Sequence, residues 1–105
     1  MEKTRLQMLR EASNATPSNA FLRYGLAMEL KSSGREEEAV EQFRHLLEHH
    51  PDYAATYYQA GMLLLKLGRR EEARQVMTRG LEVNTRLGNS HARDELQAAL
   101  DEIGD

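Results

Sequence analysis

The chain has 105 residues, of which 40% are hydrophobic and 30% are charged, so it is long enough for one folded domain and too short for two ordinary ones. Its formal net charge is -3 and its arginines are interleaved with glutamates, which argues against nucleic acid or an anionic membrane as a partner. The absence of cysteine excludes disulfides, thiolate metal sites and a cysteine nucleophile, and it favours a location in the reducing cytoplasm.

The first predicted element is a helix over residues 2–16. We expect Leu9 and Ala12 to be its inner residues and Pro17 to follow its end. Charged residues are scattered through this segment, which therefore lacks the continuous apolar stretch of a signal peptide. The longest apolar run of the chain, residues 60–65, is far too short to cross a membrane, so we expect no membrane association.

Residues 20–53 are followed by a second copy of the same segment, residues 54–87, in altered form. Aligned without gaps, the copies are identical at eleven of 34 positions, where average composition would give about two by chance. The identical pairs are Ala20/Ala54, Tyr24/Tyr58, Met28/Met62, Leu30/Leu64, Gly34/Gly68, Arg35/Arg69, Glu37/Glu71, Glu38/Glu72, Ala39/Ala73, Leu47/Leu81 and Glu48/Glu82. The sequence therefore contains a duplicated structural unit.

Each copy is predicted to form two helices joined by a tight turn. In the first copy, Leu22, Leu26 and Leu30 recur at helical spacing before the turn, and Ala39 and Phe43 do so after it. The small alanine, repeated in the second copy, allows the two helices of a hairpin to approach closely. A larger side chain in its place would overpack the hairpin.

The turn of each copy is predicted at a glycine, Gly34 in the first and Gly68 in the second. Glycine just past a helix end adopts the left-handed conformation without a Cβ clash. The glutamates at 36–38 then fall in the first turn of the next helix, where carboxylates favour the positive end of the helix dipole. The glycine and the glutamates after it therefore predict the end of one helix and the start of the next.

The last predicted element is a helix over residues 89–104. Leu96, Leu100 and Gly104 repeat the pattern of the first helix in each copy. The interval from Gly68 to Gly104 is 36 residues, so two residues are inserted relative to the 34-residue period, within residues 85–90.

These features resemble the tetratricopeptide repeat, a family of helical hairpins with a 34-residue period. Ala39, Phe43 and Pro51 match the second half of the family pattern, and Tyr57 and Ala60–Gly61 match the first half. The resemblance covers nearly the whole chain. It implies an all-α fold, a right-handed α-α superhelix of antiparallel helix hairpins, of the kind found in small bacterial repeat proteins.

The resemblance also implies a division of residues 1–105, taken as a single domain of about six helices. Residues 2–16 form an N-terminal half-repeat helix and residues 89–104 a C-terminal capping helix. The two full repeats lie between them, over 20–53 and 54–87. The chain departs from the family pattern at Arg23, Met77 and Thr85, where a large aromatic, a phenylalanine and a proline are usual.

Membership in this family would imply a protein-protein interaction module, an adaptor or scaffold, that binds a peptide or helix of a partner protein in a concave groove. The matching groove positions are Phe21, Tyr24, Met28, Lys31, Tyr58, Gln59, Met62, Leu65 and Lys66, and a third helix would add His91, Asp94, Glu95 and Ala98. The repeated tyrosines and methionines fit either a ligand-facing strip or ordinary packing between helices. Both interpretations remain open from the sequence.

One subtype of the family holds the C-terminal carboxylate of heat-shock chaperones with lysine, asparagine and arginine side chains. Here Tyr24, Met28, Gln59 and Glu95 stand at the corresponding positions, so we expect no chaperone-tail receptor. An apolar groove flanked by lysines favours a helix or an extended peptide with an apolar face.

Self-association is the first alternative. Helices at the two ends of a stack are covered on one side only, so the chain could form a weak homo-oligomer through Leu6, Leu9, Leu96 or Leu100.

A metal-dependent enzyme is the second alternative, since His45 and His49 have helical i, i+4 spacing with Glu48 and His50 beside them. The zinc-protease pattern is absent, because no glutamate directly follows His45. Histidine is also favoured at a helix end without any metal. We expect no metal, no cofactor and no enzymatic activity.

Overall fold

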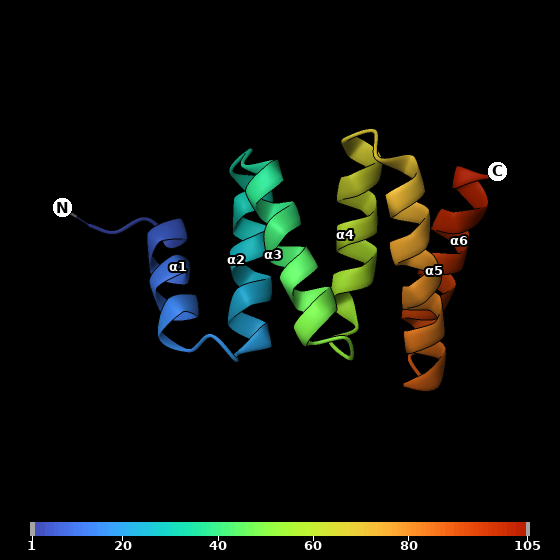
Figure 1. Cartoon of the computed structure of the whole chain (residues 1–105), viewed down its shortest axis with the longest axis horizontal. Coiled ribbons are helices and arrows are strands. Elements are labelled where there is room, and N and C mark those ends of the chain that lie inside the picture. The colour runs from blue at the N-terminus through green and yellow to red at the C-terminus, as the bar shows by residue number, and fades with distance from the viewer. Residues whose placement is uncertain (1, 105) are drawn as a thin grey trace. The chain divides into compact units, whose positions relative to one another are not determined.

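The computed structural model describes residues 2–104, which form six helices and no strand (Figure 1). The helices are α1 (Arg5–Ala15), α2 (Ala20–Ser32), α3 (Glu36–His49), α4 (Ala55–Lys66), α5 (Arg70–Arg86) and α6 (Ser90–Ile103). The predicted all-α fold of helical repeats is confirmed. None of these helices is both long enough and apolar enough to span a bilayer.

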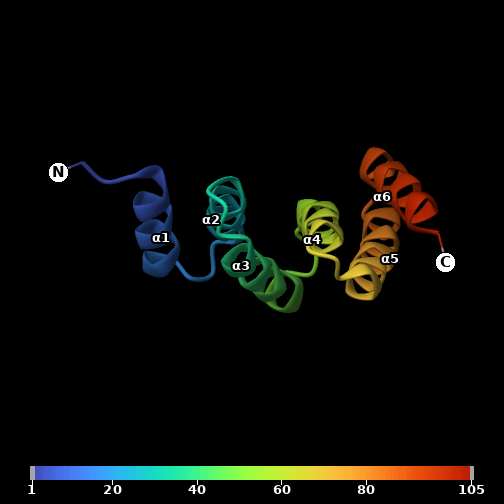
Figure 2. The same cartoon turned by 90° about the horizontal axis from the view of Figure 1, so that it is seen from above.

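The helices divide into two compact units, one extending through His50 and the other beginning at Pro51. In the first unit α2 packs against both α1 and α3, and in the second α5 packs against both α4 and α6 (Figures 1 and 2). Helix α6 also contacts α4 directly. Each unit therefore consists of three helices with a middle helix that is covered on two sides.

Helix α1 begins with a capping box. The Thr4 hydroxyl accepts a hydrogen bond from the backbone N–H of Gln7, whose side chain accepts one from the Thr4 N–H in return. The buried residue of α1 is Ser13, which is 2% exposed, whereas the predicted inner residues Leu9 and Ala12 are half-buried. The apolar spacing alone missed Ser13 because burial here depends on the neighbouring helix.

Both predicted turns are present, and Gly34 and Gly68 have φ angles of 80°. After each glycine, the next backbone N–H bonds back to the carbonyl at the end of the preceding helix: Arg35 to Leu30 at 2.9 Å and Arg69 to Leu64 at 2.8 Å. This is the bond that closes a helix with a left-handed residue at its end. The predicted helix stop is confirmed in both copies.

The helix after each turn begins as expected, with acidic residues in its first turn. Ala39 and Ala73 are both fully buried, which agrees with their predicted place between the helices of a hairpin. The core of the first unit consists mainly of Leu26, Ala27, Leu30, Ala39, Val40, Phe43 and Leu46, and that of the second of Tyr57, Ala60, Leu63, Leu64, Ala73, Met77 and Leu96.

The inserted residues lengthen α5, which has 17 residues where α3 has 14. Pro51 follows α3 and cannot donate a helical hydrogen bond, whereas its counterpart Thr85 lies within α5 and donates its hydroxyl to the carbonyl of Leu81 at 2.7 Å. Replacing the proline thus allows the helix to continue. The longer helix ends before Gly88, whose φ angle is 77°.

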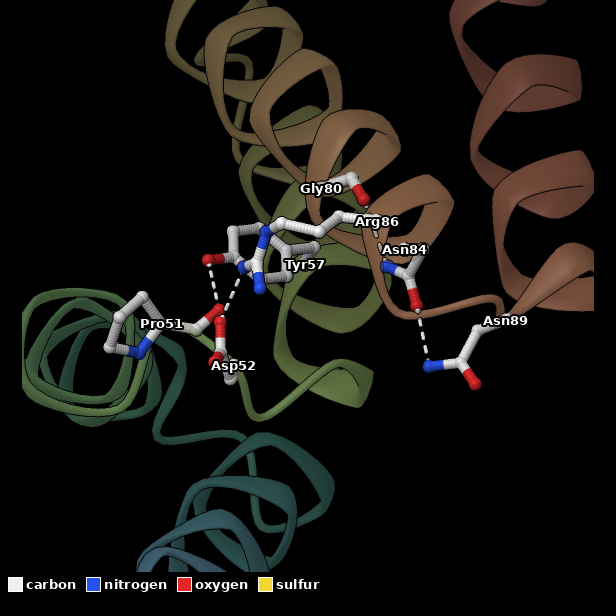
Figure 3. Close-up of polar contacts among 7 residues, drawn as sticks. All are labelled: Pro51, Asp52, Tyr57, Gly80, Asn84, Arg86 and Asn89. Carbon is white, nitrogen blue, oxygen red and sulfur yellow. Dashed lines mark hydrogen bonds and ion pairs between the residues drawn. The ribbon is translucent and has the colours of Figure 1, made fainter.

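A buried amide ties the end of α5 to the inserted residues (Figure 3). Asn84 is completely buried, and its side-chain N–H donates to the carbonyl of Gly80 at 2.9 Å. Its side-chain oxygen accepts a hydrogen bond from the side-chain amide of Asn89 at 3.2 Å. Because these bonds use polar atoms that would otherwise be buried without partners, they hold the turn between α5 and α6 in place.

The start of α4 is held by a second set of polar contacts (Figure 3). The Tyr57 hydroxyl donates to the carbonyl of Pro51 at 2.6 Å, and Arg86 forms an ion pair with Asp52 at 2.6 Å. Burial raises the pKa of Tyr57, so the hydroxyl keeps its proton and remains a donor. These contacts join the segment before α4 to α4 itself and to the end of α5.

Candidate functional site

A pocket of about 380 Å³ lies in the second unit, with walls from α4 and α6 and one arginine from α5. Three of the groove residues predicted on α4 line it: Tyr58, Met62 and Leu65. They are four and three residues apart, so they project from one face of α4. The opposite face of the same helix is buried, which leaves this face available to the pocket.

Helix α6 contributes the facing wall through Glu95, Ala98, Ala99, Glu102 and Ile103. The two alanines lie between the two carboxylates along the helix. Since alanine side chains are short, they leave room opposite the longer side chains of α4. The wall is therefore apolar in the middle and acidic toward both ends.

The end of this wall is attached to α5 by two arginines. Arg70 donates to the carbonyl of Ile103, and Arg74 donates to the carbonyl of Gly104 at 2.6 Å. Carbonyls at a helix C-terminus lack partners within the helix, so these bonds satisfy groups that would otherwise depend on water. Arg70 also lines the pocket and places a positive charge at this end.

The two carboxylates of the pocket differ in their partners. Glu95 lies 3.5 Å from His91, a pair that is ionic only when the histidine is protonated. Within residues 2–104, Glu102 takes part in no ion pair or side-chain hydrogen bond. Both acids therefore remain able to accept hydrogen bonds from a ligand.

Two further predicted residues of α4, Gln59 and Lys66, lie outside the lining of this pocket, and so do His91 and Asp94 of α6. Glu95 and Ala98, which were also predicted as groove positions, line it.

The remaining predicted groove residues belong to α2 in the first unit. Phe21 is 72% exposed, whereas Tyr24, Met28 and Lys31 are half-buried. The Tyr24 ring lies 6.3 Å from the ring of Phe43 with an interplanar angle of 58°, so it packs against the core of its own hairpin. A groove shared between these residues and those of α4 remains a prediction.

Sequence reasoning missed Ala99, Glu102, Ile103 and Arg70. The first two follow Glu95 by four and seven residues and share its helix face, so continuing the pattern along α6 would have found them. Arg70 gave no such signal, because its contact with Ile103 joins residues far apart in the chain.

The histidine pair on α3 is a contact between rings. His45 and His49 have ring centroids 4.3 Å apart. The pKa of His45 is lowered below its ordinary value, mainly by burial and to a smaller extent by the charge of Arg23. Within residues 2–104, no three potential ligands among His, Asp and Glu are grouped to hold a metal ion, so the metal alternative gains no support from this geometry.

The self-association alternative needs one correction. Leu96 is only 1% exposed because α6 packs against α5, so it is unavailable to a second copy. Leu6, Leu9 and Leu100 are half-buried.

Comparison with known proteins places this architecture among repeat proteins. Residues 30–100 match the family model described as tetratricopeptide repeat. A curated relative, an uncharacterized protein of Methanocaldococcus jannaschii, is 36% identical over 64 residues, which cover 61% of this chain and 74% of the relative.

The chain is also similar to solved structures. A tetratricopeptide repeat domain protein from Salinibacter ruber is 34% identical; its solution structure has a TM-score of 0.80, with 84% of this chain and 89% of that chain covered. Its crystal structure has a TM-score of 0.78 and covers 81% of this chain and 96% of that chain. A protein from Bordetella parapertussis shares the fold at a TM-score of 0.81 with 24% identity, over 97% of this chain and 89% of that chain.

Proposed function

The chain belongs to the tetratricopeptide repeat family, and we propose that it is a non-catalytic protein-binding domain that holds a peptide or helix of a partner protein against α4 and α6. In this proposal residues 1–105 act as a single domain, with repeats over 20–53 and 54–87. The cytoplasmic location expected from the sequence is part of the same proposal.

The pocket between α4 and α6 is the observation that carries this proposal. Met62 is 39% exposed within it, although large apolar side chains on α4 are otherwise mostly buried. Methionine and tyrosine provide a large contact area that adapts to different side chains of a ligand. A concave, mainly apolar pocket with a few polar groups is the usual form of a binding site.

The proposed contact set extends beyond the pocket. Gln59 and Lys66 belong to it from α4, and Phe21, Tyr24, Met28 and Lys31 from α2. Phe21 is the most exposed large apolar residue of α2, and its burial by a ligand would remove apolar surface from water. The packing of Tyr24 against Phe43 suggests that Tyr24 supports the surface more than it anchors a ligand.

Affinity capture tests the proposal with a matched pair of variants. Tyr58→Ala/Met62→Ala removes two large side chains that line the pocket. Leu87→Ala is the control, because Leu87 lies outside the lining and is exposed to nearly the same extent as Met62. We expect a partner protein to be retained by the wild type and Leu87→Ala and lost from the double variant.

Circular dichroism melts of all three proteins would show whether each remains folded. A partner retained equally by all three, or no partner retained by the wild type, would contradict binding in this pocket.

A further inference from the structure

The charge pattern of the pocket indicates the chemistry of its occupant. We propose that the occupant is a basic amphipathic segment of another protein, with an apolar side chain placed against Met62 and the two alanines of α6. Lysine or arginine side chains on either side of it pair with Glu95 and Glu102. This inference rests on the proposed function, because it specifies the ligand of the same site.

The first step is the placement of the acids. Glu95 and Glu102 are seven residues apart on α6, which is about two helical turns and about 10 Å along the axis. Residues at this spacing share one face, and both line the pocket together with Ala98 and Ala99 between them. A ligand side chain seated on the alanines therefore has a carboxylate on each side.

The second step is the availability of these acids to a ligand. Glu102 has no ion pair within the part of the chain that the structure describes, and the partner of Glu95 is His91, whose side chain is 91% exposed. A ligand cation can take the place of this histidine without breaking a buried contact. Hydrogen bonds from lysine or arginine to a carboxylate are among the stronger ones in proteins.

The third step concerns the positive charge in the pocket. Arg70 is the cation among the lining residues, and its guanidinium donates to the carbonyl of Ile103 at one end of the pocket. Two carboxylates thus face one arginine that is already held by the protein. An acidic ligand would meet an excess of like charge, whereas a basic ligand would meet complementary charge.

The fourth step concerns size. A volume of about 380 Å³ is near the lower end of the range for ligand pockets, about 300–1,000 Å³. The pocket suits one or two anchoring side chains more than an entire helix face, so residues flanking the anchor lie at the acidic rim. The charge of these flanking residues then decides which segments bind.

Selection from a phage-displayed library of random 12-residue peptides tests this inference. The immobilised proteins are the wild type, Glu95→Gln/Glu102→Gln, and Glu41→Gln/Glu82→Gln. The last is a control with the same charge change at exposed positions outside the pocket. We expect the wild type and the control to enrich peptides with lysine or arginine close to an apolar residue, and the pocket variant to lose the basic preference.

A synthetic peptide from the enriched pool gives the quantitative readout by fluorescence anisotropy. Glu95→Gln/Glu102→Gln should raise its Kd about fivefold and reduce its dependence on salt, because exposed ion pairs are weak and screened. Met62→Ala should raise the Kd while leaving the salt dependence unchanged.

The two proposals fail differently in this experiment. Enrichment of acidic or uncharged apolar peptides on the wild type would overturn the inferred ligand charge and leave peptide binding intact. If no peptide is enriched on the wild type, both the inference and the proposed function are overturned.

Discussion

The two full repeats fill the contact between their helices with different residues. In the second, Tyr57 on α4 packs over Gly80 on α5, so closely that a Cβ atom on the glycine would lie 2.4 Å from the Tyr57 Cβ. The equivalent residues of the first repeat are Arg23 and the fully buried Leu46. The second repeat thus pairs a buried tyrosine with a glycine, whereas the first has a half-buried arginine and a buried leucine at these positions.

A second pair of positions keeps its larger residue on the second helix of each hairpin. Phe43 and Ala27 of the first repeat correspond to Met77 and Gly61 of the second, where a Cβ atom on the glycine would lie 2.6 Å from the Met77 Cγ. Different pairs of residues therefore lie between the helices of the two hairpins. Substitutions at equivalent positions should consequently have unequal effects.

The largest inequality is expected at Tyr57, whose counterpart in the first repeat is Arg23. Tyr57→Ala removes a fully buried ring and its hydrogen bond to Pro51, and should lower the free energy of unfolding by about 3–5 kcal/mol. Arg23→Ala at the equivalent position loses a bond to Gln42 and should cost about 1 kcal/mol. Urea denaturation followed by circular dichroism measures both free energies of unfolding, and equal costs would contradict unequal roles for these two residues.

A smaller effect is expected from Gly80→Ala. The added Cβ lies 2.4 Å from the Tyr57 Cβ, whose position is fixed by the backbone, so rotation of the tyrosine side chain cannot relieve the contact. We expect a loss of about 2 kcal/mol, the usual cost of overpacking reduced by the better helix propensity of alanine. An unchanged urea midpoint would contradict the close contact with Tyr57.

Gly61→Ala should cost less than Gly80→Ala, although its added Cβ also meets atoms at short range. Those atoms belong to the flexible side chain of Met77, which can adopt another rotamer. The gain in helix propensity of about 1 kcal/mol offsets much of the strain, so we expect a net change below about 1 kcal/mol. A loss equal to that of Gly80→Ala, measured in the same urea series, would show that Met77 cannot move.

The smallest expected effect is on how stability depends on pH. It arises at a position where the first repeat has His45 and the second has Arg79. Burial and the neighbouring Arg23 lower the pKa of His45 below its ordinary value of 6.5. The unfolded chain then binds the proton more readily than the folded one, so stability is full above pH 6.5 and falls as the pH drops through the lowered pKa.

Replacing the histidine removes this dependence. The urea midpoint of His45→Gln should fall less than that of the wild type between neutral and mildly acidic pH. His91→Gln provides the control, because that side chain is 91% exposed. Equal pH dependence in the wild type and His45→Gln would exclude His45 as its source.

Local sequence signals predicted most of the fold. Gly34 and Gly68 identified the turns because few other residues tolerate a φ angle of 80°, and the 34-residue period identified the hairpins. The burial of Ser13 and Asn84 could not be found this way. Polar residues become buried when a neighbouring helix covers them and supplies hydrogen bonds, and periodicity does not record such contacts.

The candidate site was predictable to a similar degree. Tyr58, Met62 and Leu65 were identified from the repeat pattern, and all three line the pocket. The repeat pattern predicted Tyr24 and Tyr58 as equivalent groove residues. In the structure the Tyr24 ring lies beside Phe43, whereas Tyr58 lines the pocket. The closing contact of Arg70 with Ile103 required the packed structure, since it depends on where α6 ends relative to α5.

Peptide binding between α4 and α6 is tested most directly by methyl-resolved NMR titration with a basic, apolar peptide from the phage selection. The methyl signals of Met62, Ala98 and Ala99 should shift and saturate together, while the signal of the fully buried Met77 stays in place. Pocket methyl signals that remain unmoved at millimolar peptide, whether or not other signals shift, would contradict binding at this site.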